Sequence, residues 1–195
     1  MARSLARVTF LLAALAATTP ALAQEKGGAG AEKPRVGFGI SMTAFDWVGL
    51  QVASPVPTTA DVSVNFDIGQ FRLEPSLGFS RYSIDGGQEG SDLNLGCGLL
   101  IPLKAGKSVS IYTGPRLFLG FASASNGAGF SDSGVDFTVA GVLGAEWFAD
   151  PHFSIGAEAR LSLVVLSDLT DAGVVLRDGA TVFATSGHVY LRFYL

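Results

Sequence analysis

Cysteine, histidine and basic clusters are scarce in this sequence of 195 residues, and each shortage excludes a class of protein. The single cysteine, Cys97, has no second cysteine with which to form an internal disulfide. The 13 lysine and arginine residues are scattered, and the 17 acidic residues bring the net charge to -4. Without a basic patch, nucleic acid is excluded as a partner. Two histidines are too few for a clustered metal or cofactor site, so we expect no cofactor.

Long apolar runs are also missing, although the composition is strongly apolar. Hydrophobic residues make up 48% of the chain and charged residues 15%, with a mean hydropathy of +0.40. These values are too apolar for an ordinary soluble domain of this size. Beyond the N-terminus, however, no run reaches the roughly 18 apolar residues of a membrane-spanning helix. The apolar residues instead recur at every second position, as transmembrane β-strands require.

The N-terminal segment has the pattern of a cleavable signal peptide over residues 1–23. Arg3 and Arg7 precede an apolar stretch that is too short to span a membrane as a stop-transfer helix, and Ala21 and Ala23 flank a small-residue cleavage site. Residues 24–34, rich in glycine, alanine, glutamate and lysine, predict a disordered periplasmic lead. The folded domain is therefore expected over residues 35–195.

The stretch from residue 137 to residue 166 gives the clearest structural signal. Apolar residues alternate with a second set that includes Glu146, Glu158 and Arg160, and the sequence Asp150-Pro151 marks a tight turn between two strands. Each strand is about ten or more residues long, whereas soluble strands usually have about five or six and tilted membrane strands about nine to eleven. We interpret the apolar face as lipid-facing, with Trp147 in an aromatic girdle and the charged face turned toward a lumen.

The same alternation elsewhere predicts eight strands in all. The eighth strand runs from residue 181 to the end of the sequence, and Cys97 lies on an outward apolar row of the fourth, which Pro102 is expected to end. Long loops are predicted at 45–60, 84–91, 122–135 and 167–180, and short turns at 69–70, 102–107 and 149–152. The first loop is apolar and is expected either to pack over the barrel mouth or to contact a partner.

An even number of strands, with long loops at one side and short turns at the other, resembles the small OmpA/OmpX-type eight-stranded outer-membrane proteins. The resemblance implies an all-β fold, an eight-stranded antiparallel up-and-down transmembrane β-barrel, in the bacterial outer membrane. It also implies contact with outer-membrane lipid and lipopolysaccharide, and insertion by the barrel-assembly machinery, which reads alternate residues of the last strand. The matching residues are Val189, Leu191, Phe193 and Leu195. Leu195 stands where this family usually has an aromatic residue.

Most charged residues within the predicted strands fall on the inward face. An eight-stranded barrel has an interior just wide enough for its side chains, so we expect a packed ion network and not a wide channel. The predicted ion network consists of Arg72, Glu74, Arg116, Glu146, Glu158, Arg160 and Arg192. The other predicted polar lumen residues are Tyr112, His188, Tyr190 and Tyr194.

Several functions are compatible with this pattern. The interpretation that we favour is a non-enzymatic, monomeric outer-membrane protein with a structural or surface-interaction role. The alternatives are a narrow pore or ion path, a lipid-modifying enzyme that uses Ser186 and His188, and a soluble lipocalin-like barrel whose apolar face points inward. Asp168, Asp171 and Asp178 could hold a divalent cation weakly, but a solvated loop is the simpler interpretation, and no metal site is predicted.

Overall fold

The computed structural model describes residues 34–195 except for 49–59, 85–87, 106–107, 127 and 172. The predicted signal peptide and all but the last residue of the predicted periplasmic lead lie outside these described residues, as does most of the predicted first loop. Within the described part of the chain, no helix has the length and apolarity needed to cross a membrane.

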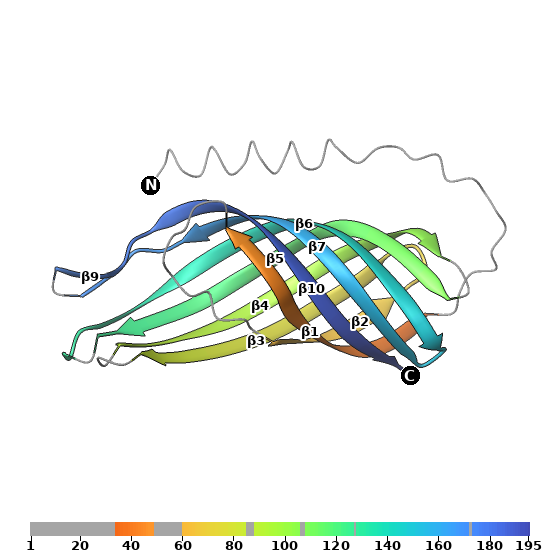
Figure 1. The fold of residues 1–195 in the computed structure, drawn as a ribbon, viewed down its shortest axis with the longest axis horizontal. Coiled ribbons are helices and arrows are strands. Elements are labelled where there is room, and N and C mark those ends of the chain that lie inside the picture. Colours follow the sequence, from red (N-terminus) through yellow and green to blue (C-terminus); the bar gives the residue numbers. More distant parts are fainter. Residues whose placement is uncertain (1–33, 49–59, 85–87, 106–107, 127, 172) are drawn as a thin grey trace. The chain divides into compact units, whose positions relative to one another are not determined.

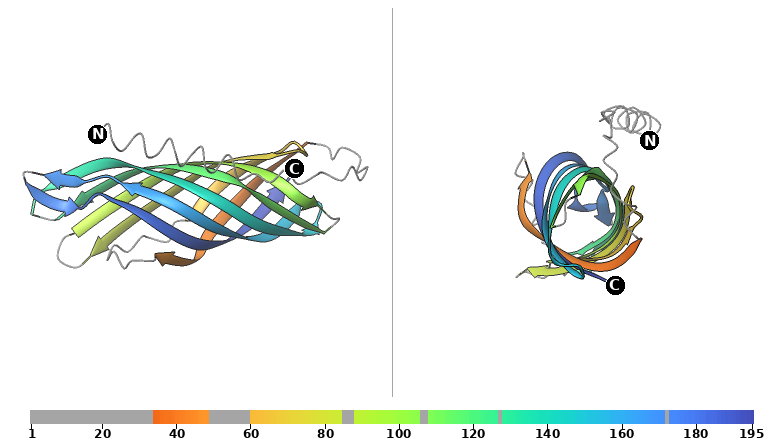
Figure 2. Two further views of the ribbon diagram at one scale, coloured as in Figure 1. Left: turned by 90° about the horizontal axis from the view of Figure 1, so that it is seen from above. Right: turned by 90° about the vertical axis from the view of Figure 1, so that its right-hand side faces the viewer.

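Eight long strands form one closed antiparallel barrel, as predicted. Going around the barrel, the strands follow the order β1, β10, β7, β6, β5, β4, β3, β2, so the first strand pairs with the last (Figure 1). The view along the barrel shows the closed ring (Figure 2). The barrel strands are β1 Arg35–Val48, β2 Ala60–Asp67, β3 Arg72–Ile84, β4 Gln88–Ala105, β5 Val109–Ser125, β6 Ser131–Asp150, β7 Phe153–Leu166 and β10 Ala180–Tyr194.

The predicted long loops are wrong in extent, because strands continue into three of them and a separate hairpin forms in the fourth. β1 continues to Val48, only three residues separate β3 from β4, and five separate β5 from β6. A two-stranded sheet of β8 (Leu169–Asp171) and β9 (Val174–Arg177) occupies the segment 167–180. Serine, glycine and aspartate favour loops locally, but here a neighbouring strand pairs with each extended segment and satisfies its backbone hydrogen bonds.

The short turns and both ends of the barrel chain lie at one end of the barrel, which we call the turn end; the opposite end is the loop end. The turn between β2 and β3 depends on Gly69, which has a φ of 81° and donates its N–H to the Asp67 carboxylate at 3.0 Å. The turn between β6 and β7 is closed by the Asp150 carboxylate, which accepts the His152 N–H at 2.6 Å. Both turns fall where the sequence predicts them.

Pro102 does not end the fourth strand as predicted. β4 continues to Ala105, and its pairing with β5 shifts register between Pro102 and Lys104. A β-bulge tolerates a residue that has no N–H to donate, so the strand passes through the proline with one irregularity. Pro75 and Pro115 each pair in register on one side only, opposite Cys97 and Gly141. On the other side each lies in a gap of the ladder, between β2 and β3 for Pro75 and between β4 and β5 for Pro115.

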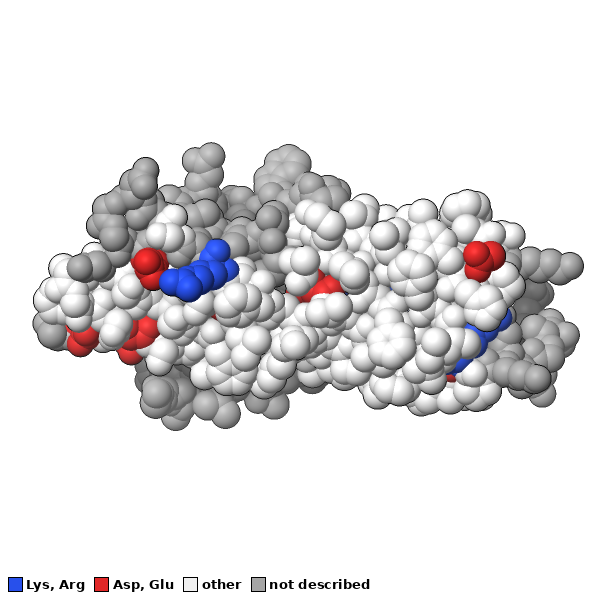
Figure 3. Space-filling view, turned by 90° about the horizontal axis from the view of Figure 1, so that it is seen from below, with Lys and Arg blue, Asp and Glu red and all other residues white. Residues whose placement is uncertain are grey.

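The outward face of the barrel is apolar, and charged side chains lie inside. Phe79 is 63% exposed, Leu143 56% and Leu161 60%, whereas Arg192 is 1% exposed. The side shown in Figure 3 is almost uncharged between its two ends, apart from one small acidic patch. This arrangement excludes the soluble lipocalin-like alternative, which requires the apolar rows inside and the arginines outside.

The height of the apolar belt matches a bilayer. Outward apolar residues on β5 extend from Val109 to Phe121, which is twelve residue steps. At about 3.3 Å per residue and a tilt of about 40°, these steps give a belt about 30 Å high. The hydrocarbon core of a bilayer is also about 30 Å thick.

Candidate functional site: a chain of ion pairs in the barrel lumen

Eight charged side chains in the lumen form one continuous chain of alternating sign. Each consecutive pair in this charge chain is joined by an ion pair, and the members come from β2, β3, β5, β6, β7 and β10. In order, the charge chain is Arg160, Glu158, Arg116, Glu74, Arg192, Glu146, Arg72 and Asp67. Asp67 lies at the turn end, and Arg160 lies furthest toward the loop end.

The middle of the charge chain crosses the lumen from one wall to the other. Glu74 on β3 accepts hydrogen bonds from Arg116 Nη2 on β5 at 2.6 Å and from Arg192 Nη2 on β10 at 2.5 Å. Three strand-to-strand steps separate β10 from β3 around a ring of eight strands. The pair of Arg192 and Glu74 therefore links nearly opposite walls.

The two ends of the charge chain continue the same pattern. On one side, Arg116 contacts Glu158 at 2.7 Å, and Glu158 also accepts from Arg160. On the other side, Arg72 bridges Glu146 at 2.7 Å and Asp67 at 3.0 Å. Glu146 and Arg72 stand on β6 and β3, which are again three steps apart.

Charge balance explains why so many ionised groups can be buried together. Four arginines face four carboxylates, so the charge chain has no net charge. Seven of its members are buried, and Asp67 is partly buried at the end. A buried ion requires an opposite charge and hydrogen bonds to offset its desolvation. Because every ion touches at least one of opposite sign, deleting one member leaves its neighbours buried and undercompensated.

Three tyrosines fill the space around the charge chain. Tyr112 donates its hydroxyl to Glu158 at 3.1 Å or to the Tyr190 hydroxyl at 3.0 Å, and Tyr194 donates to Glu146 at 2.6 Å. The guanidinium carbon of Arg192 lies 3.8 Å from the centre of the Tyr190 ring, which is within cation–π range. All three tyrosines therefore pack the lumen; Tyr112 and Tyr194 also donate to carboxylate oxygens, and Tyr190 donates to the Ala145 carbonyl.

Inward-facing glycines make room for these rings. A Cβ atom at Gly144 would lie 2.2 Å from the Tyr112 ring carbon Cζ, and one at Gly156 would lie 2.1 Å from the same atom of Tyr190. Each glycine stands on a different strand from the ring that it accommodates. Part of the glycine content of this chain is therefore a packing requirement of the crowded lumen.

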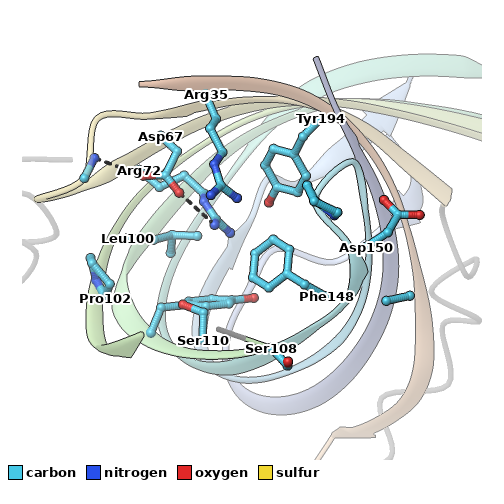
Figure 4. A pocket seen from close by; sticks show the side chains of 14 residues that line it. Arg35, Asp67, Arg72, Leu100, Pro102, Ser108, Ser110, Phe148, Asp150 and Tyr194 are labelled. Atoms are coloured by element: carbon cyan, nitrogen blue, oxygen red, sulfur yellow. Dashed lines mark hydrogen bonds and ion pairs between the residues drawn. The ribbon is translucent and has the colours of Figure 1, made fainter. Parts of the chain in front are cut away.

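A cavity of about 310 Å³ opens at the turn end of the barrel. Figure 4 shows Arg72 and Asp67, joined by their ion pair, on one side of it, with Phe148 and Tyr194 on another. The rings of Phe148 and Tyr194 are 5.8 Å apart, and the guanidinium carbon of Arg35 lies 5.9 Å from the Phe148 ring. The cavity is a vestibule lined on one side by the last ion pair of the charge chain, Arg72 with Asp67.

The structure places all seven predicted network residues and all four predicted polar residues on the inward face. The inward polar groups that sequence reasoning missed include Asp61, Asn65 and Asp67. Asp67 matters most, because it supplies the fourth carboxylate that balances the four arginines. The signal was present: all three residues share the inward parity of β2, opposite the apolar Val62, Val64 and Phe66 row.

The lumen histidine does not belong to a catalytic triad among the described residues. Ser186 and His188 are within hydrogen-bond distance, with Ser Oγ and His Nε2 3.0 Å apart. The other ring nitrogen of His188, Nδ1, is buried and has no hydrogen-bond partner among the described residues. Glu158 is the cross-strand neighbour of His188, but its oxygens accept hydrogen bonds from Arg116, Arg160 and Tyr112. No carboxylate in the described ranges therefore orients the imidazole as nucleophilic catalysis requires.

The aspartates of the β8–β9 segment bond to backbone amides. Asp171 accepts the Ser131 N–H at 2.9 Å, and Asp168 accepts the Gly179 N–H. Over the described residues, no group of three or more histidine, cysteine, aspartate or glutamate side chains has the arrangement of a metal site.

The last strand and the cysteine present apolar side chains outward. Val189, Leu191, Phe193 and Leu195 are all exposed on the outer face of the barrel, and Cys97 is an exposed free thiol on β4. The predicted assembly residues therefore form one continuous outward row.

Comparison with known proteins agrees with this architecture. Residues 9–177 match the family model described as outer membrane protein beta-barrel domain. A comparison with curated protein sequences finds no match.

Solved structures share the fold at low sequence identity. Neisserial surface protein A is 14% identical with a TM-score of 0.56, and the match covers 85% of this chain and 99% of that one. Ail, the attachment invasion locus protein of Yersinia pestis, solved with the heparin analogue sucrose octasulfate, is 14% identical with a TM-score of 0.54, covering 84% and 100%. A major outer membrane protein of Thermus thermophilus is 10% identical with a TM-score of 0.52, covering 84% and 100%.

Proposed function

Because the chain belongs to the outer membrane protein β-barrel domain family and is located in the bacterial outer membrane, we propose that it is a non-enzymatic barrel with a closed lumen. Its role is either structural or the binding of other molecules at its surface. The observation that carries this proposal is the charge chain, in which eight alternating charges link opposite walls of the lumen. These ion pairs make the barrel rigid, so that it keeps the segments at its loop end in a fixed position.

The orientation and assembly of the barrel form part of the same proposal. We place the turn end in the periplasm and the loop end outside the cell, which is the usual plan of such barrels. The outward row ending at Leu195 supports recognition of the last strand by the barrel-assembly machinery. Closure of β1 on β10 supports a monomer, because the barrel wall has no open edge that a second copy must cover.

Two alternatives are less well supported by the geometry. A narrow ion path would need a continuous gap past Arg192 and Glu74, and these side chains meet across the lumen. A lipid-modifying enzyme would need Ser186 and His188 at a lipid-accessible surface, and both project from the inward face of β10.

Planar-bilayer recording tests the closed lumen. We expect the refolded wild-type protein to give no unitary conductance steps. The double variant R192A/E74A removes one cation and one anion from the middle of the charge chain and should give small steps. Its matched control is R81A/E89A, which removes an exposed ion pair of 3.1 Å outside the lumen and should stay silent. Clear steps from the wild-type protein would overturn the proposal in favour of the pore.

A further inference from the structure

Beyond the apolar belt, the outer face of four neighbouring strands becomes polar. These strands, β3, β4, β5 and β6, extend further toward the loop end than the pairing of β2 with β3, which stops at Asp61 and Gly78. We call the outward polar residues of this extension the polar shelf. It consists of Arg81, Ser83, Glu89, Ser91, Ser123, Ser125, Ser131 and Ser133.

Strand pairing arranges the polar shelf in two rows directly above an apolar row. The apolar row pairs Phe79 with Leu93, Phe121 and Val135 across the four strands. The next outward row pairs Arg81 with Ser91, Ser123 and Ser133. The last row pairs Ser83 with Glu89, Ser125 and Ser131. The outer surface thus changes from hydrocarbon to hydroxyl in one step of two residues, about 7 Å along each strand.

The polar shelf contains a shallow groove of about 500 Å³. At its apolar edge stands Phe79, 63% exposed, which offers a ring to the C–H face of a sugar. Arg81 and Glu89 form an exposed ion pair at 3.1 Å, and the hydroxyls of Ser91 and Ser123 lie 2.9 Å apart. Each hydroxyl can still donate or accept toward a ligand.

We propose that the polar shelf binds the sugar headgroup of a glycolipid in the outer leaflet. The inference rests on the membrane placement and orientation given above, and it adds a ligand to a surface that the closed lumen does not involve. A lipid whose acyl chains cover the apolar belt up to the Phe79 row must place its headgroup on the polar shelf, so that Phe79 stands at the boundary between acyl chain and sugar. The shelf is continuous with the lipid-contacting belt, so the same molecule reaches both.

The chemistry of the polar shelf selects sugar hydroxyls over phosphate. Six of its eight residues are serines, and its only cation, Arg81, is already paired with Glu89. The eight residues therefore have no net charge, and Asp132, which also lines the groove, adds a negative charge and no cation. Phosphate recognition normally uses unpaired or clustered arginine and lysine. Uncharged hydroxyls with an adjacent aromatic ring match the alternating polar and apolar surface of a saccharide.

Native mass spectrometry of the detergent-solubilised full chain can measure this binding with three lipid probes. The probes are lipid A, dephosphorylated lipid A and phosphatidylglycerol. We expect both sugar-containing probes to bind within a fewfold of each other, and phosphatidylglycerol to bind at least tenfold more weakly. Equal binding of phosphatidylglycerol, or loss of binding on dephosphorylation, would show that charge and not sugar is recognised and would overturn the proposal.

An isosteric pair of variants tests the hydroxyls themselves. S91V/S123V removes two hydroxyls from the middle row, and S91T/S123T keeps them on a side chain of the same shape. Both use β-branched residues that suit an exposed strand, so both variants should fold. We expect about a tenfold weaker dephosphorylated lipid A binding for the valine variant and wild-type binding for the threonine variant. Equal affinities of the two variants would contradict the inference, whereas the conductance of the lumen would be unaffected by either result.

Discussion

Replacing Glu74 with alanine should strongly destabilise the barrel. Glu74 is buried and accepts from both Arg116 and Arg192. Each contact contributes about 4 kcal/mol of Coulomb energy at an effective dielectric constant of about 20. Removing the carboxylate also removes its own desolvation cost of several kcal/mol, so the net loss is about 3–5 kcal/mol. The charge chain is then left with four arginines and three carboxylates.

Urea unfolding of the protein in lipid vesicles, followed by the fluorescence of Trp47 and Trp147, measures this loss. Glu89→Ala is the matched control, because it deletes one carboxylate from an exposed ion pair and should cost no more than about 1 kcal/mol. Glu74→Gln keeps the side-chain volume and removes only the charge, so it should fall between the two. If Glu74→Ala and Glu89→Ala lowered the free energy of unfolding equally, the account of the charge chain as an interdependent unit would be refuted.

Three further predictions concern the glycines, the belt and the thiol. Gly156→Ala should cost about 1–3 kcal/mol in the same unfolding assay because its Cβ would overlap Tyr190, and Tyr190→Leu in the same chain should recover most of that loss; no recovery would contradict the steric explanation. Leu143→Arg, in the middle of the apolar belt, should lower the free energy of unfolding by about 2–4 kcal/mol, whereas Ser133→Arg on the polar shelf should leave it nearly unchanged. Equal losses for the two variants would show that the apolar belt is assigned to the wrong residues. Cys97 should react with an apolar maleimide but not with a charged one when the protein is in vesicles, and labelling by the charged reagent would show that its row is not covered by lipid.

The predicted loop boundaries show where local composition misleads. Ser123, Ser125, Ser131 and Ser133 predict a loop from their composition, yet each lies in a strand whose partner is already in register. Pairing depends on residues far away in the sequence, and an extended segment outside the bilayer still gains by satisfying its backbone groups. The β8–β9 hairpin was not predicted for a different reason: its strands have only three and four residues, which is too short for a clear alternation of polar and apolar residues.

Alternation by itself determined which side of each strand meets lipid and which side meets the lumen. A period of two assigns Glu74, Glu146 and Arg192 to one face and Phe79, Leu143 and Phe193 to the other, and the length of the strands selects a bilayer as the surrounding solvent. The count of eight barrel strands follows from the same pattern.

Only the tertiary structure decided which inward charges touch. Arg192 and Glu74 are 118 residues apart in sequence and meet because closure of the ring brings β10 and β3 to opposite walls of one narrow lumen. Strand stagger sets the depth of each side chain, and this places Asp67 as the fourth carboxylate that completes the neutral charge chain. No local pattern contains that information, because depth in a barrel depends on the register of all eight strands together.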